Sequence, residues 1–270
     1  MKTMIGKSFK ITKSDARVRD DQFQMIRNTA GSFQVVPKDA LVTIENYNLN
    51  GLQRLDYLKV TNFGWTARTN FEFSLLNEVV RTIAPGYFSQ AEDHFTVVDE
   101  DARIRKKTGN DYLMTKELIP VCTLLIAKEF SADRKLVQVA YTRRVDAGFE
   151  EDTTRKPVWT KTSNLFAGWF DAYGLNSLWR KGNFLGLKSV SAVVGGNGDI
   201  KHVVTETFDF YLKMMEAARK DGLGLELTSG FRTWGKQHTL FELHLKNKGN
   251  LAAKPGHSNH QNGIAFDLNT

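Results

Sequence analysis

The sequence predicts a multidomain chain in which two small all-β domains precede an α+β domain. Two observations carry this prediction: blocks of sequence recur in the same order in the first 165 residues, and a helix–strand–helix pattern follows Val203. A chain of 270 residues has room for two or three domains. Its 41% hydrophobic and 25% charged residues are typical of globular proteins.

An internal duplication accounts for the two all-β domains, which we place at residues 7–71 and 95–165. Asp15-Ala-Arg-Val-Arg19 returns as Asp101-Ala-Arg-Ile-Arg105, and Trp65-Thr-x-x-x-Asn70 returns as Trp159-Thr-x-x-x-Asn164. Short runs of β-branched and aromatic residues between turn residues predict strands in both copies. Repeated blocks in one order indicate repeated structure, so we expect two compact barrels that superpose on each other.

Residues 72–94 are predicted to form a helical linker between the copies. Phe73, Leu76, Val80 and Ile83 recur at helical spacing over this stretch, and Pro85-Gly86 provides a stop.

The last domain, residues 166–270, has the pattern of an α+β fold. Apolar spacing predicts a long helix that Gly222 ends, then a strand, a second helix, a loop and a final strand. These elements are expected at Val203–Asp221, Leu223–Thr228, Trp234–Lys246, Gly249–Gly256 and Ile264–Leu268.

Charge and targeting signals narrow the function classes. The net charge is +7, but no run of Lys and Arg forms a stripe, so we expect no nucleic-acid partner. No apolar run is long enough for a membrane span. The start of the chain lacks the apolar core of a signal peptide, which predicts synthesis in the cytoplasm without one. The single Cys122 excludes an internal disulfide, and we interpret it as a buried small hydrophobe.

The candidate chemistry lies near the end of the sequence. His260 and Asp267 are separated by a segment containing Gly263, where the backbone can turn tightly. Imidazole and carboxylate are ligands that Zn²⁺ takes, so this pair predicts a metal site. Arg232 follows the Ser229-Gly230 turn, where a guanidinium can hold a carboxylate or a developing oxyanion. A purely structural ion pair is the alternative for Arg232.

These residues resemble a known family. Ser258-x-His260-x-x-Gly263-x-Ala265-x-Asp267 resembles the zinc motif of D-alanyl-D-alanine carboxypeptidases and L-alanyl-D-glutamate endopeptidases, which cut peptidoglycan peptides. Ser229-Gly-Phe-Arg232-Thr, followed by Gln237 and Leu240-Phe241, resembles the second signature of that family. The resemblance covers roughly residues 166–270. It implies Zn²⁺ held by His260 and Asp267, a catalytic Arg232, and substrate contacts from Arg232, Gln237 and Ser258.

The family takes a third zinc ligand, a His, and a catalytic Glu from well beyond the Asp, whereas this sequence stops at Thr270. We therefore expect an incomplete peptidase domain, truncated at its C-terminus, with weak zinc binding and little activity. His257 is a less favoured candidate for the third ligand, because the family places no ligand there.

Each repeated copy resembles a bacterial Src-homology-3-like domain, a small barrel common in cell-wall proteins. The first copy has the Gly64-Trp65 pair of that family, and the second has Val158-Trp159 in its place. The resemblance implies that the two barrels target the wall. Each Trp either lines a ligand groove or packs in a core.

The leading functional prediction is therefore a peptidoglycan hydrolase that cuts stem-peptide bonds with a zinc-activated water. It would be an endolysin-like, bacteriolytic enzyme associated with a phage or an injection system. It would reach the cell wall or periplasm by phage-type release, injection or leaderless secretion. The expected partners are peptidoglycan and components of a phage or injection machine. The alternative is a catalytically incomplete binding or structural component of a phage tail or contractile injection machine.

Overall fold

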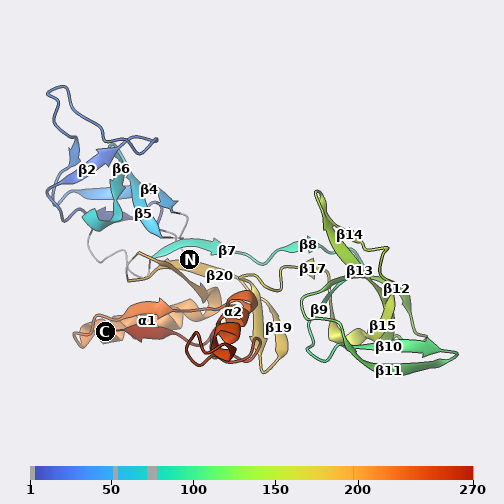
Figure 1. Ribbon diagram of the computed structural model, residues 1–270. Coiled ribbons are helices and arrows are strands. Elements are labelled where there is room, and N and C mark those ends of the chain that lie inside the picture. The colour runs from blue at the N-terminus through green and yellow to red at the C-terminus, as the bar shows by residue number, and fades with distance from the viewer. Residues whose placement is uncertain (1–3, 51–53, 72–77, 197, 270) are drawn as a thin grey trace. The chain divides into compact units, whose positions relative to one another are not determined.

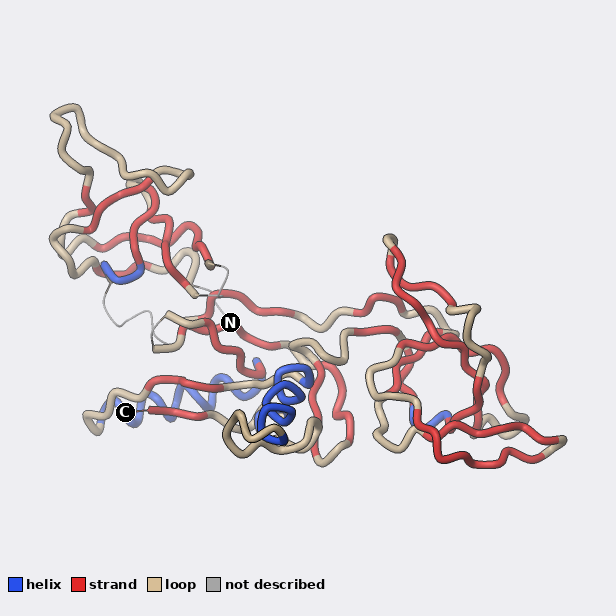
Figure 2. Tube along the Cα trace, viewed as in Figure 1, coloured by secondary structure: helices blue, strands red, loops and turns tan. Residues whose placement is uncertain are grey.

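The structure is a computed structural model that describes residues 4–50, 54–71, 78–196 and 198–269. Strands predominate throughout, and two α-helices lie among the described residues (Figures 1 and 2). The chain divides into two compact units that each combine separate segments. The first unit is Met1–Ile83, Ser189–Phe231 and Gly263–Thr270, and the second is Ala84–Lys188 and Arg232–Asn262. The four consecutive domains expected from the sequence stay predictions.

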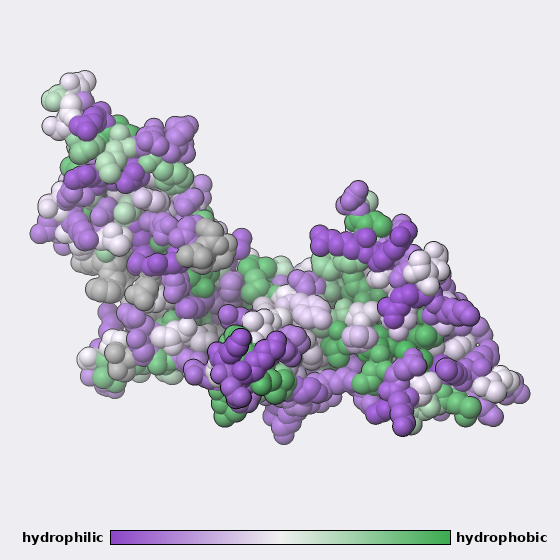
Figure 3. All heavy atoms as spheres, viewed as in Figure 1, coloured by the Kyte–Doolittle hydropathy of each residue, from purple (hydrophilic) through white to green (hydrophobic). Residues whose placement is uncertain are grey.

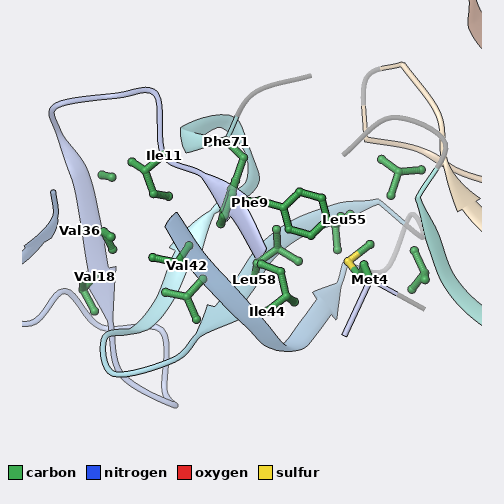
Figure 4. Packing of buried hydrophobic residues seen from close by; sticks show 14 of the residues in the cluster. Met4, Phe9, Ile11, Val18, Val36, Val42, Ile44, Leu55, Leu58 and Phe71 are labelled. Atoms are coloured by element: carbon green, nitrogen blue, oxygen red, sulfur yellow. The ribbon is translucent and has the colours of Figure 1, made fainter. Parts of the chain in front are cut away.

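A six-stranded antiparallel sheet, which we call the first sheet, occupies the start of the first unit. Alternating residues of its strands turn inward, as Val42 and Ile44 do, whereas the neighbouring Leu41 is exposed. The buried side chains converge on one cluster (Figure 4). In order across the sheet, its strands are β1 (Ser8–Lys10), β4 (Leu41–Leu49), β5 (Leu55–Val60), β6 (Gly64–Ala67), β2 (Ala16–Arg19) and β3 (Val35–Val36).

The rest of the first unit combines two small sheets with a helix. The helix, α1 (Thr205–Lys220), buries Phe208, Tyr211 and Met215 against Val193 and Val203. This confirms the first helix expected from the sequence, with Gly222 just beyond it at a φ of 79°. The accompanying strands are β21 (Ile200–Val204), β20 (Val190–Val194) and β7 (Val79–Ile83) in one sheet, and β22 (Glu226–Ser229) and β23 (Asp267–Asn269) in the other.

The helical linker expected over residues 72–94 is wrong where the structure describes it. Val79–Ile83 is strand β7, paired antiparallel with β20, and Tyr87–Ser89 is strand β8. Residues 72–77 lie outside the described residues. β-branched residues such as Val79, Val80 and Ile83 suit a pleated surface, and a partner strand more than a hundred residues away is invisible to local periodicity.

The second unit contains an eight-stranded antiparallel sheet, the second sheet. Its strands run in the order β11 (Asp111–Leu118), β10 (Arg103–Thr108), β15 (Val158–Lys161), β13 (Leu136–Val145), β12 (Leu124–Phe130), β9 (His94–Val97) and β16 (Leu165–Ala167), and β14 (Gly148–Glu151) also pairs with β13. Two short strand pairs accompany it: β8 with β17 (Trp169–Phe170), and the hairpin of β18 (Ser177–Arg180) with β19 (Asn183–Leu187). Helix α2 (Trp234–Leu245) confirms the second expected helix.

The repeated sequence blocks occupy equivalent positions in the two sheets. Ser8 of β1 lies opposite Thr43 of β4 in the first sheet, and His94 of β9 lies opposite Ile126 of β12 in the second. The pairing of β1 with β4 therefore has the same register as the pairing of β9 with β12.

The ends of the two copies match as well. The buried amide of Asn70 donates to Thr66 Oγ1 at 2.8 Å, and that of Asn164 donates to Thr160 Oγ1 at 3.0 Å. Each sheet has two edge strands, β1 and β3 in the first and β11 and β16 in the second, with no pairing between them among the described residues. Closure into a Src-homology-3-like barrel therefore stays a prediction.

Two residues singled out in the sequence, Trp65 and Trp159, are buried, and a third, Cys122, is partly buried. Trp65 and Trp159 are 8% and 3% exposed, which favours the core interpretation for both. Cys122 packs against the cluster around Phe170, and burial raises the pKa of its thiol. The thiol is therefore a poor nucleophile near neutral pH, as expected for a small buried hydrophobe.

On the face drawn in Figure 3, hydrophilic residues are spread over both units, with apolar residues among them. Within the described part of the chain, no helix combines the length and the apolar composition needed to cross a membrane.

Acid should weaken the first unit through His202. This residue lies in β21, and burial, reinforced by the charge of Arg81, lowers its pKa from 6.5 to about 4. The folded protein then takes up a proton only near pH 4, whereas the unfolded chain takes it up near 6.5. Stability present above pH 6.5 is therefore lost as the pH falls through that window, by about 3 kcal/mol. Thermal melts of wild type and His202→Gln between pH 7 and 4 measure this, and the variant should show the flatter profile. Identical pH profiles would contradict the assignment.

Candidate active site

Helix α2 begins two residues after Arg232, with Thr233 as its N-cap. The Thr233 hydroxyl accepts a hydrogen bond from the backbone N–H of Lys236 at 3.0 Å, which satisfies one of the open donors of the first turn. Trp234, the first helical residue, packs on Trp179 with the ring centroids 4.3 Å apart. Arg232 therefore precedes a helix end that is fixed by both a cap and an aromatic anchor.

The buried side-chain amide of Gln237 links Arg232 to the loop before the motif of residues 258–267. Gln237 is completely buried, and its Oε1 accepts from Nη1 of Arg232 at 2.9 Å. Its Nε2 donates to the carbonyl oxygen of Ala253 at 2.6 Å. Both polar atoms of the amide are thus hydrogen-bonded within the protein, so the structure favours a positioning role for Gln237. Direct contact of Gln237 with substrate stays a prediction.

The motif itself starts on a tight turn. Gly256 has a φ of 84°, and a Cβ at this position would lie 2.9 Å from the ring of Trp234. Only glycine fits such a close approach in this conformation. The turn leads into a short 3-10 helix, Asn259–Gln261, whose N-cap is the buried Ser258.

Ser258 and Arg232 hold the backbone of His260. The Ser258 hydroxyl accepts from the backbone N–H of His260 at 3.3 Å. The backbone N–H of Arg232 donates to the carbonyl oxygen of His260 at 3.0 Å. The structure thus brings together Arg232, Gln237, Ser258 and His260, four of the five site residues expected from the sequence.

Two residues that the sequence analysis missed support this turn. Gln261 is completely buried, and its Oε1 accepts from the backbone N–H of Gly256 at 2.8 Å. Glu100 reaches the same loop, 2.5 Å from Nζ of Lys254 and 3.4 Å from Nε2 of His257. Gln261 stands at an unspecified position of the motif, and Glu100 is far away in sequence, so no local signal identifies either. The contact with Glu100 also gives His257 a structural partner.

Asp267, the fifth site residue, belongs to the other unit, where it opens β23. It lies opposite Ser229 of β22 in the strand pair. Gly230 follows, and a Cβ there would collide with the carbonyl oxygen of His202, which accepts from Phe231 N–H at 2.6 Å. The signature turn thus needs glycine for close packing. The final strand is confirmed only from Asp267 onward, because Ile264 precedes the pairing with β22 and is exposed.

The donor set has the chemistry of a zinc site but not its full number. The imidazole of His260 and the carboxylate of Asp267 are both zinc ligands by type, whereas a hydrolytic zinc site uses three protein ligands and a water. In the described ranges, no three His, Cys, Asp or Glu residues are grouped so that they could hold a metal ion. The two side chains suit zinc by type, and a metal site that they share stays a prediction.

Two comparisons with known proteins both find carboxypeptidases. Residues 201–270 match the VanY family of D-alanyl-D-alanine carboxypeptidases. The chain is also similar to a putative carboxypeptidase, YodJ, of Bacillus subtilis (strain 168), with 33% identity over 75 residues. That similarity covers 26% of this chain and 28% of the Bacillus protein. Residues 201–270 are thus similar to D-alanyl-D-alanine carboxypeptidases, and the remainder of the chain has no part in this family match.

Proposed function

We propose that the protein is a zinc-dependent peptidase that cuts stem peptides of peptidoglycan. One observation carries the proposal: the match of residues 201–270 to D-alanyl-D-alanine carboxypeptidases contains the complete spacing of Ser258, His260, Gly263 and Asp267. In the proposal, His260 and Asp267 are two of the zinc ligands. The third ligand and the general base come from residues that remain to be found.

The roles of the other residues follow from their contacts. When bound, zinc would polarise the scissile carbonyl and lower the pKa of a bound water. Arg232 is proposed to hold the substrate carboxylate or the developing oxyanion, and Gln237 fixes one nitrogen of its guanidinium. Ser258 holds the turn that carries His260. Each of these interactions orients groups before the reaction, and such preorganisation contributes directly to rate.

The two sheets of the first 165 residues are proposed to target the enzyme to the cell wall. The support is the resemblance to bacterial Src-homology-3-like domains together with the equivalent registers of β1 and β9. Delivery by a phage or an injection machine remains part of the proposal, and so does action at the wall or periplasm.

Release of D-alanine or peptide fragments from purified peptidoglycan, with and without added zinc, tests the proposed function. With two ligands available, the 270-residue chain should bind zinc weakly and release little product. A chain extended by a segment that supplies a His and a Glu should release product in a zinc-dependent way. No release by the extended chain would instead support the inert, structural role. Robust release by residues 1–270 alone would show that another group in this chain completes the zinc site.

A further inference from the structure

The second sheet contains a pocket of about 610 Å³ that has no part in the proposed chemistry. Its charged lining is one carboxylate, Asp133, and three cations, Arg105, Lys135 and Lys161. Leu136, Thr162 and Ser163 complete it. The pocket therefore carries a formal charge of +2, and a volume of several hundred Å³ is ordinary for a ligand site.

The strand register explains why the cations gather. In the order β10-β15-β13, Arg105 lies opposite Trp159, and Lys161 lies opposite Leu136. Side chains at directly opposite positions share a face of the sheet, as do residues two apart along one strand. Arg105, Leu136 and Lys161 thus extend from the same face of three neighbouring strands. Lys161 is on the middle strand, with Arg105 on the strand to one side and Leu136 on the strand to the other.

Only part of the charge in this pocket is neutralised internally, by the pair of Lys135 and Asp133. The carboxylate of Asp133 is engaged by Lys135 at 3.5 Å and by the hydroxyl of Ser131 at 2.8 Å. Lys161 has no ion pair among the residues that the structure describes. Arg105 donates through Nη1 to the carbonyl oxygen of Tyr112 at 3.3 Å, and its Nε is buried. Arg105 and Lys161 therefore retain their positive charge toward the pocket.

The first sheet provides an internal comparison, because the same register places different residues there. Ala67 lies opposite Tyr57, where the second sheet has Lys161 opposite Leu136. The residue before Tyr57 is Asp56, in the place of Lys135.

The arginine at the equivalent position of the first sheet is also engaged differently. The guanidinium of Arg19 lies over the ring of Tyr57, 5.3 Å from its centroid, and Nη1 donates to the carbonyl oxygen of Phe23 at 2.9 Å. The basic pocket is thus a feature of the second copy and not of the repeated fold.

We propose that this pocket binds the phosphate group of a phosphodiester-linked cell-wall polymer. Two flexible lysines and the hydroxyl of Ser163 supply point charges and a donor, which suit a phosphate. The guanidinium of Arg105 adds a third positive charge, although its Nε is buried. The lining contains no aromatic side chain on which a nucleic-acid base could stack. Binding of phosphate does not depend on the proposed peptidase activity, whereas the wall origin of the polymer rests on the proposed function.

The test exchanges the two lysines for the residues of the first sheet in the full chain. Lys135→Asp/Lys161→Ala should lower binding to phosphate-polymer-bearing wall sacculi at least tenfold in a pelleting assay. Lys106→Asp/Lys116→Ala, which makes the same charge change at exposed positions of β10 and β11, should bind nearly as wild type. Lys161→Ala alone, which breaks no ion pair of the described residues, should lower binding measurably if the double variant unfolds.

Further comparisons in the same pelleting assay identify the ligand. Inorganic phosphate should compete with the polymer, and sacculi stripped of phosphate polymer should bind the wild type at the level of the pocket variant. Equal losses in both double variants, undiminished binding to stripped sacculi, or stronger competition by duplex DNA than by the wall polymer would overturn the proposal. Peptide release from a soluble substrate by a chain that is active should be the same in the pocket variant and the wild type, which separates this site from the proposed peptidase activity.

Discussion

Replacing His260 by alanine is expected to abolish zinc-dependent peptide release in a chain that is active on peptidoglycan. Changes that only disturb the partners of a metal ligand commonly cost 10–100-fold, so loss of the ligand itself should exceed about 100-fold. Zinc content after dialysis should fall together with the activity. Asp267→Asn should show the same paired loss, because the neutral amide is a much weaker zinc ligand than a carboxylate.

His257→Ala is the matched control, because the two histidines are three residues apart on one loop. The ring of His257 lies 3.4 Å from the carboxylate of Glu100, so its removal should affect the stability of the loop and leave zinc content unchanged. The opposite result, with zinc lost in His257→Ala and retained in His260→Ala, would show that the spacing of the motif was assigned to the wrong histidine.

Local patterns in the sequence predicted the helices of the C-terminal part well. Phe208 and Met215 recur on one face of α1, and both are buried. Helix α2 has a clear N-terminal signal in the sequence, because Thr233 can cap it and the glycine-containing signature precedes it. Such elements depend on residues within a few positions of one another, which a single sequence displays directly.

Long-range pairing could not be predicted in the same way. Strand β7 exists because β20 lies beside it, and the apolar residues of the segment fit a helix equally well by spacing. The second sheet has eight strands and the first has six, since β16 pairs with β9 and β14 pairs with β13. Cross-strand partners are set by tertiary packing, which a local pattern does not encode.

The candidate site shows the same difference between local signals and long-range contacts. The motifs identified Arg232, Gln237, Ser258 and His260, and the contacts among them exist in the structure. Gln261 was missed because its role depends on a backbone N–H five residues earlier. Gln237 was predicted to contact the substrate, and the structure shows its buried amide bonded to Arg232 and Ala253. This burial, which favours a positioning role, is not visible in the motif, and contact with substrate stays a prediction.

The second large effect should come from Arg232. Arg232→Ala removes the proposed donor to the substrate oxygen, and loss of one such donor typically lowers kcat by about 10²–10³-fold. Arg232→Lys retains the charge but loses the planar donor set and the bond to Gln237 at 2.9 Å, so it should recover only part of the rate. Steady-state kinetics on a soluble stem peptide, in a chain that is active, measures both.

A double-mutant cycle then decides whether Gln237 acts through Arg232. Gln237→Leu should lower kcat in the wild-type background, because the guanidinium loses a partner that fixes its position. In the Arg232→Ala background the same change should cost little further activity, since the group it orients is already gone. His238→Ala, an exposed neighbour on α2, should leave kcat unchanged in both backgrounds. Strictly multiplicative losses from Gln237→Leu and Arg232→Ala would show that Gln237 contacts the substrate independently, as the resemblance alone implied.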